Sequence, residues 1–119
     1  MADIIEQIES AVKKNKVMIF MKGNRSFPQC GFSAATVAIF DQLGVPYETA
    51  DVLSDPELRD GIKRYSNWPT IPQVYIDGKF VGGCDIIREL HETGELEPLV
   101  KAALAESATQ LSRFLAFFS

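Results

Sequence analysis

Length, composition and charge already exclude several classes of protein. The 119 residues fit one domain, and 46% hydrophobic with 24% charged residues is ordinary for a globular chain that buries a core without disulfides. The net charge of −4 gives no support to nucleic-acid binding, which uses a basic surface. Two cysteines and one histidine supply a zinc site poorly, and no segment is long and apolar enough to span a membrane.

The cysteines and the N-terminus indicate the compartment. Two widely separated cysteines, Cys30 and Cys84, suit a reducing compartment better than secretion. Residues 1–6 contain neither a secretory core nor an Arg/Ser-rich transit pattern. We therefore expect a cytoplasmic protein, with an organellar protein after processing as the alternative.

The first half of the chain predicts two helices and two strands in alternation. Apolar residues recur at helical spacing from Ile4, after Asp3 as N-cap, and the helix closes at a group of lysines ending at Lys16. The apolar run Val17–Met21 predicts a buried strand. A helical pattern then runs from Cys30 to about Leu43, and Tyr47–Val52 reads as a second strand.

The second half predicts a helix, a hairpin and two further helices. Asp55-Pro56 supplies an N-cap and a first-turn proline for a helix to about Tyr65. Strands Gln73–Ile76 and Lys79–Gly82 flank Asp77-Gly78, the signature of a type I′ turn. A helix from Cys84 or Asp85 to Thr93 follows, and another begins near Glu95. This order places a parallel β-α-β unit before an antiparallel hairpin, which predicts an α/β fold with a four-stranded mixed sheet and helices on both faces.

Cys30 is the residue with the clearest chemistry. A thiol at a helix N-terminus lies among unpaired N–H groups and the positive end of the helix dipole, so its thiolate is favoured. Lys22, at the end of the preceding strand, adds a positive charge. Ser33 occupies the position of the second thiol of a Cys-x-x-Cys motif and cannot resolve a disulfide. The site is therefore monothiol, and a redox cycle needs Cys84 or a small thiol such as glutathione.

Three ordered motifs now identify a family resemblance. They are Lys22-Gly23 with Pro28-Gln29-Cys30-Gly31-Phe32-Ser33, then Ser66-Asn67-Trp68-Pro69-Thr70-Ile71-Pro72-Gln73, then Gly82-Gly83-Cys84-Asp85. The chain resembles the monothiol glutaredoxins of the CGFS type from about Ile4 to about Leu104. The resemblance implies a thioredoxin-like fold, a glutaredoxin domain over residues 1–107 and glutathione as the ligand.

The resemblance also implies which residues hold glutathione. Lys22 and Arg59 match the positions that hold its glycine carboxylate, whereas either cation taken alone reads as solvated surface. A cis peptide bond before Pro72 would present the backbone of Ile71 to the ligand's cysteine moiety; without the family, a proline at a strand start is the simpler reading. Arg25, Lys63 and Arg64 could also reach the site, but they are interpreted as surface charges.

The second helix start, at Cys84 and Asp85, is the other implied contact. Its N–H groups suit a carboxylate and Asp85 suits an amine, although Asp near a helix N-terminus is stabilising without any ligand. The Cys84 thiol is interpreted as a buried, inert cysteine, with a regulatory disulfide to Cys30 as the alternative.

The family resemblance favours an iron–sulfur carrier. Cys30 and one glutathione from each of two chains would give the four thiolates of a [2Fe–2S] cluster, with Cys30 as the protein's metal ligand. BolA-like proteins and iron–sulfur apoproteins would be the partners of this homodimer. The alternative is a glutathione-dependent thiol–disulfide oxidoreductase that removes glutathione from proteins, weak because Ser33 cannot resolve. A thioredoxin-like interaction module is a third reading.

Beyond Leu104 the resemblance ends. Residues 108–119 are predicted as an apolar helical extension, because an apolar stripe repeats at heptad-like spacing. Its positions are Val100, Leu104, Ser107, Leu111, Phe114 and Phe118. The stripe either packs on its own domain, the reading we favour because it is short for a coiled coil, or meets a partner.

Overall fold

The computed structural model describes residues 3–105. Residues 1–2 and 106–119, and with them the predicted extension 108–119, lie outside the described residues. The elements are α1 (Ile4–Lys14), β1 (Val17–Met21), α2 (Gly31–Leu43), β2 (Glu48–Asp51), α3 (Pro56–Ser66), β3 (Gln73–Ile76), β4 (Lys79–Gly82) and α4 (Cys84–Glu92), followed by helical residues 96–105.

The four strands form one mixed sheet in the order β2-β1-β3-β4. Strand β1 pairs parallel with β2 and antiparallel with β3, and β3 pairs antiparallel with β4. Asp77 and Gly78 both have positive φ, 54° and 79°, as a type I′ turn requires. The predicted β-α-β unit, hairpin and thioredoxin-like plan are confirmed.

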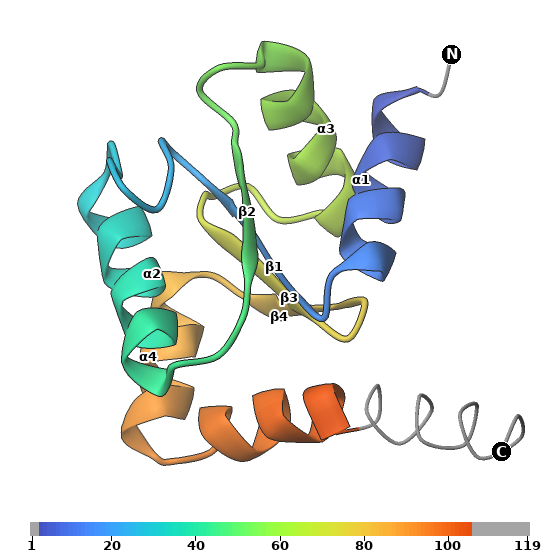
Figure 1. The fold of residues 1–119 in the computed structure, drawn as a ribbon. Coiled ribbons are helices and arrows are strands. Elements are labelled where there is room, and N and C mark those ends of the chain that lie inside the picture. Colours follow the sequence, from blue (N-terminus) through green and yellow to red (C-terminus); the bar gives the residue numbers. More distant parts are fainter. Residues whose placement is uncertain (1–2, 106–119) are drawn as a thin grey trace, which may run out of the picture.

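Helices cover both faces of the sheet (Figure 1), and an apolar cluster packs between the helices and the sheet on each face. All five residues of β1 are buried, and their side chains alternate between the layers. Val17, Ile19 and Met21 pack with α2, α4 and residues 96–105. Met18 and Phe20 pack with α1 and α3. This arrangement brings the C-terminal end of β1 beside the N-terminus of α2, where the motif cysteine lies.

Strand β2 is shorter than the predicted Tyr47–Val52. Tyr47 lies before the strand because its groups are engaged elsewhere. Its ring packs on Phe40, its phenol donates to Asp41, and its carbonyl oxygen accepts from Arg25.

The predicted apolar stripe is only partly visible in the described residues. Val100 is buried and Leu104 packs against the same core, as expected for a helix that covers its own domain. The positions from Ser107 onward lie outside the described residues.

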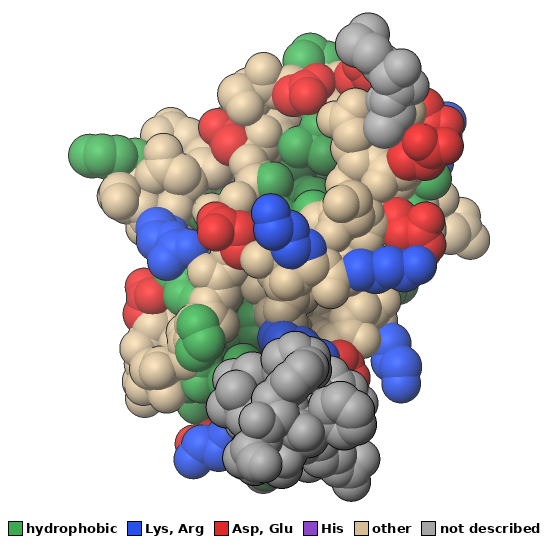
Figure 2. All heavy atoms as spheres, turned by 45° about the vertical axis from the view of Figure 1, so that its right-hand side comes forward, with side chains coloured by type: hydrophobic (Ala, Val, Ile, Leu, Met, Phe, Trp, Pro, Cys, Tyr) green, Lys and Arg blue, Asp and Glu red, His purple; other side chains and the backbone are tan. Residues whose placement is uncertain are grey.

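No helix within residues 3–105 combines the length and the apolar character needed to cross a membrane. On the face shown in Figure 2, acidic and basic side chains are interspersed, and no basic stripe crosses the described residues there.

Candidate functional site

A cavity of about 530 Å³ lies where β1, α2, α3 and α4 meet, in the range of about 300–1,000 Å³ usual for small-molecule sites. It is lined by Lys22, Cys30, Phe32, Arg59, Lys63, Trp68, Pro69, Thr70, Ile71, Pro72, Gly83, Cys84, Asp85 and Ile86. All six site residues predicted from the sequence are among them. The fold therefore brings together residues that are up to 63 positions apart in the chain, from Lys22 to Asp85.

Cys30 is the N-cap residue of α2 and has an extended backbone, and the first N–H groups of the helix follow it in the chain. The backbone N–H of Ser33 makes the largest contribution to lowering the pKa of the Cys30 thiol. Burial opposes this, while the N–H of Phe32, the charge of Lys22 and the Ser33 hydroxyl lower the pKa further. The expected direction is confirmed, but Lys22 contributes less than the helix N–H groups.

Ser33 does more than omit a second thiol. It is fully buried, and its Oγ accepts a hydrogen bond from the backbone N–H of Lys22 at 3.1 Å. The same hydroxyl lies within reach of the Cys30 sulfur. Ser33 thus joins the end of β1 to the first turn of α2, a role that the motif alone did not reveal.

The loop between Lys22 and Cys30 is closed by its own backbone. Gln29 donates to the Lys22 carbonyl at 2.9 Å, and Gly23 donates to the Asp51 carboxylate at 3.0 Å. Gly23 has φ +84°, and a Cβ there would lie 2.5 Å from the Phe27 carbonyl oxygen. This position therefore requires glycine.

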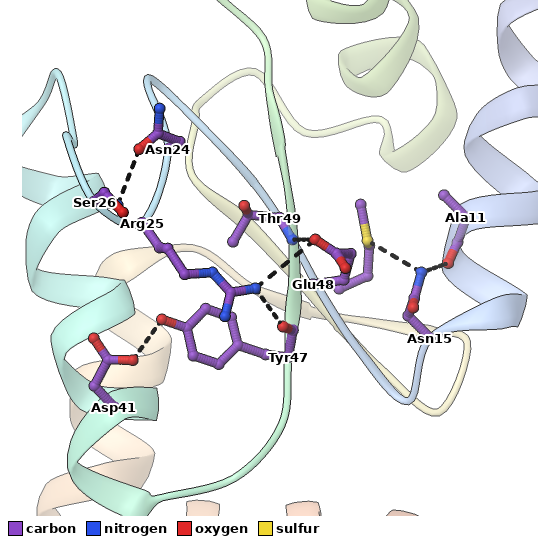
Figure 3. Close-up of polar contacts among 10 residues, drawn as sticks. Ala11, Asn15, Asn24, Arg25, Ser26, Asp41, Tyr47, Glu48 and Thr49 are labelled. Carbon is purple, nitrogen blue, oxygen red and sulfur yellow. Dashed lines mark hydrogen bonds and ion pairs between the residues drawn. The ribbon is translucent and has the colours of Figure 1, made fainter.

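Arg25, a residue of the same loop, contacts Tyr47 and Glu48 and so holds the loop against the start of β2 (Figure 3). Its guanidinium stacks 4.4 Å from the Tyr47 ring centroid and donates to the Tyr47 carbonyl at 2.7 Å. It also lies 3.8 Å from the Glu48 carboxylate. Arg25 is thus not among the cavity residues, as expected, but it has a structural function that sequence reasoning missed.

Three cations line the cavity rather than the two predicted. Lys22 lies at the end of β1, and Arg59 and Lys63 lie four residues apart on α3, so they share one face of that helix. Lys63, interpreted from the sequence as a surface charge, lines the cavity. Its spacing from Arg59 was the available signal. Arg64 is exposed and is not among the lining residues, in agreement with its interpretation.

Residues 68–72 form one wall of the cavity. The Ile71–Pro72 peptide bond is cis, as the resemblance implied. Ile71 is buried, yet no backbone hydrogen bond joins its N–H or C=O to another residue within 3–105. A buried residue with an unpaired donor and acceptor beside a cavity is suited to pair with an extended ligand.

Apolar side chains at the rim were also missed. Phe32 is 60% exposed and Trp68 37% exposed, and both line the cavity together with Ile86. Trp68 packs on Phe80, 5.7 Å between ring centroids. The Phe and Trp of the motifs were visible in the sequence, but their exposure was not.

At the start of α4 the two predicted residues differ in accessibility. Cys84 is buried, and its Sγ accepts from the Arg88 guanidinium at 3.6 Å. Asp85 is exposed in the first turn. Both cysteines are free thiols. Among the described residues, no three His, Cys, Asp or Glu side chains gather closely enough to hold a metal ion.

Comparison with known proteins agrees with this geometry. Residues 17–81 match the glutaredoxin family. A monothiol glutaredoxin of ycf64-like type from Synechocystis is 59% identical over 99 residues, which is 83% of this chain and 92% of that protein.

Two solved structures share the fold. That of reduced apo GrxS14 from poplar has a TM-score of 0.75 and 47% identity, covering 84% of this chain and 92% of that one. A buckwheat glutaredoxin–glutathione complex has a TM-score of 0.76 and 27% identity, covering 84% and 89%.

A thioredoxin-like sheet with a single low-pKa thiol at the start of α2 defines the class of protein. The chain belongs to the glutaredoxin family, and its Cys30-Gly31-Phe32-Ser33 motif and its relatives place it among the monothiol members.

Proposed function

We propose that the cavity binds glutathione. This tripeptide has a carboxylate at each end, one amine and one thiol. Lys22, Arg59 and Lys63 form a cationic wall for one carboxylate, because charged donors make the stronger hydrogen bonds. The unpaired backbone groups of Ile71 support pairing with the middle of the peptide, as in the addition of a short strand.

The other end of glutathione would lie at the start of α4. The first N–H groups of this helix, at Cys84 and Asp85, suit the second carboxylate, and the Asp85 carboxylate suits the amine. The ligand's thiol then lies beside Cys30. The glutathione complex of the buckwheat glutaredoxin, a protein of the same fold, supports this assignment.

We further propose that two such chains carry one [2Fe–2S] cluster as cargo. Four thiolates hold a cluster of this type, and thiolate is the donor that selects it. Cys30 supplies one thiolate per chain, and bound glutathione supplies the other. The observation that carries this proposal is the thiol of lowered pKa at the cavity, in a described chain where no three His, Cys, Asp or Glu side chains lie close enough to hold a metal ion by themselves.

The residues around Cys30 fit the donor that a cluster requires. The N–H groups of Ser33 and Phe32 and the charge of Lys22 lower the pKa of the Cys30 thiol and so favour its thiolate. The exposed Phe32 lies two residues after Cys30 in the chain, where a second subunit would approach. We propose a cluster-bridged homodimer in the cytoplasm, with BolA-like proteins and iron–sulfur apoproteins as its partners.

The lowered pKa of Cys30 also favours a second function, a glutathione-dependent oxidoreductase. The Cys30 thiolate would attack the glutathione sulfur of a protein mixed disulfide, and the protein thiolate would leave. A second glutathione thiolate would then attack the Cys30–glutathione disulfide, releasing glutathione disulfide and regenerating Cys30. Ser33 gives no internal route for the second step, so turnover should be slow. Turnover equal to that of a two-cysteine glutaredoxin would favour this second function.

Anaerobic reconstitution with iron and sulfide tests the carrier function. With glutathione present, the protein should acquire visible absorption and iron and elute as a dimer. Without glutathione, or with its S-methyl derivative, which cannot supply a thiolate, it should remain colourless and monomeric. Equal cluster content in all three samples would contradict the proposal.

A further inference from the structure

A fully buried amide lies behind the wall formed by residues 68–72. Gln73, the first residue of β3, has no solvent exposure. Its Nε2 donates to the carbonyl oxygens of Trp68 at 3.1 Å and Thr70 at 3.3 Å. Its Oε1 accepts from the Tyr75 hydroxyl at 3.1 Å. Both N–H donors of the amide are therefore used on carbonyls of the wall.

The hydrogen bonds to these two carbonyls restrain residues 68–72. Within the described residues, Gln73 provides the only side-chain hydrogen bonds to a carbonyl of residues 68–72. Thr70 directly precedes Ile71, whose own N–H and C=O are unpaired. Because Gln73 holds the carbonyl before Ile71, it restricts rotation of the peptide group that carries the Ile71 N–H. The orientation of the Ile71 N–H toward the cavity therefore depends on Gln73, which does not itself line the cavity.

Tyr75 determines the orientation of the Gln73 side-chain amide. Its phenol is a donor to Gln73 Oε1, and burial raises the pKa of Tyr75 to about 12, so the proton stays in place through the neutral range. The ring is packed against Phe20 and Phe80, with centroids 5.7 and 5.4 Å away. A fixed donor facing Oε1 leaves the NH₂ group facing Trp68 and Thr70.

We propose that Gln73 is a positioning residue for glutathione, which holds the Trp68–Thr70 carbonyls so that the Ile71 backbone stays aligned with the ligand. This inference rests on the proposed binding of glutathione in the cavity. A purely structural role would differ in its consequences. A structural residue would change affinity only as far as it changes the folded population, whereas a positioning residue changes affinity in protein that is fully folded.

The test compares Gln73→Met with the unsubstituted protein by calorimetric titration of reduced glutathione. Methionine preserves length and apolar packing but removes both donors. We expect the dissociation constant for glutathione to rise about tenfold, which corresponds to the loss of one hydrogen bond between the Ile71 backbone and the ligand. The pKa of Cys30 should be unchanged, since its causes lie in α2 and at Lys22 rather than in this wall.

Two further variants separate positioning from stability. Val100→Ala removes buried volume from the apolar cluster on the other face of the sheet, which contains neither Ile71 nor Tyr75, and should lower the melting temperature without changing glutathione affinity. Gln73→Glu replaces the donor by a carboxylate facing two carbonyls. Its affinity should be weakest at high pH and recover as the pH falls, because a protonated carboxyl regains one donor. If Gln73→Met does not fold, Tyr75→Phe keeps the ring but frees the amide, and should weaken binding about threefold.

The outcomes distinguish this inference from the proposed function. Unsubstituted protein that fails to bind glutathione would overturn both. If the unsubstituted protein binds glutathione and folded Gln73→Met binds it with the same affinity, only the role of Gln73 is overturned. If Gln73→Met does not fold, equal affinity in Tyr75→Phe has the same meaning. An equal loss of affinity in Val100→Ala would also overturn it, because stability would then explain the effect.

Discussion

The backbone N–H of Lys22 donates to the Oγ of Ser33 at 3.1 Å, which ties the end of β1 to the first turn of α2. The residue that replaces the second thiol of a redox pair is therefore part of the support of Cys30. Its backbone N–H and its hydroxyl both stabilise the thiolate. Ser33 therefore both lacks the resolving thiol and supports the remaining thiol of Cys30.

Ser33→Ala tests this support. The pKa of Cys30 should rise but stay below that of an ordinary thiol, because the backbone N–H of Ser33, the largest cause, remains. Stability should fall by about 1–2 kcal/mol, since the Lys22 N–H loses its acceptor. Thiolate absorbance against pH and denaturant unfolding measure the two effects. Ser26→Ala, in the exposed loop, is the control, and an unchanged Cys30 pKa in Ser33→Ala would contradict the assignment.

The lowered pKa of Cys30 predicts a specific pH dependence of stability. The folded state holds the thiolate at a pH where the unfolded thiol, with a pKa of about 8.5, is still protonated. The unfolded state then binds more protons, so this contribution grows as the pH rises from the folded to the unfolded pKa and is constant above it. It is lost as the pH falls through the folded pKa.

Denaturant unfolding of reduced protein at a series of pH values measures this contribution against Cys30→Ser. The difference in stability between the two proteins should increase as the pH rises from the lowered pKa of folded Cys30 to about 8.5, the pKa of the unfolded thiol. A difference that is flat with pH would mean that the thiol is not activated.

The cationic wall gives a prediction with a matched control on the same helix. Arg59→Gln should weaken glutathione binding by roughly threefold to tenfold, because a charge-assisted contact at an exposed rim contributes about 0.7–1.4 kcal/mol. Lys63→Gln should also weaken binding, since Lys63 lines the cavity. Arg64→Gln, exposed on α3 and outside the cavity, should not. Equal losses for Arg59 and Arg64 would indicate diffuse electrostatics instead of a specific contact.

Glycine at position 23 provides a test of the loop. Gly23 and Gly78 have similar φ values, +84° and +79°, so alanine costs about 1–2 kcal/mol of backbone strain at either position. Only at Gly23 would the new Cβ also contact backbone, at 2.5 Å, whereas nothing lies within 4 Å at Gly78. Gly23→Ala should therefore be more destabilising by at least about 1 kcal/mol in denaturant unfolding. Equal losses at the two positions would show that the loop is free to move aside.

The sequence predicted most of the fold because its signals were local. Strands Val17–Met21, Gln73–Ile76 and Lys79–Gly82 have the predicted bounds, since each is an apolar or alternating run limited by turn residues. The order of strands in the sheet was not predicted beyond the β-α-β unit and the hairpin. The pairing of β1 with β3 depends on contacts between distant segments.

The site residues were predicted only where the family resemblance assigned a position to them. The cavity contains all six predicted residues, but the positions of Lys63 and Trp68 in its lining and the burial of the Gln73 amide were not predicted. Their functions depend on which side chains the fold turns inward or toward one another. Arg25 illustrates the same limit, because its partner Tyr47 is 22 residues away and meets it only in the folded chain.

The most direct measurement of the central claim is native mass spectrometry of the protein reconstituted anaerobically with glutathione. The account predicts one species, of two chains, two glutathiones, two irons and two sulfides. Cys30→Ser should abolish this species, and Cys84→Ser should retain it, because the Cys84 sulfur is buried beside Arg88. A cluster-loaded Cys30→Ser dimer, or a cluster-loaded species without glutathione, would contradict the account.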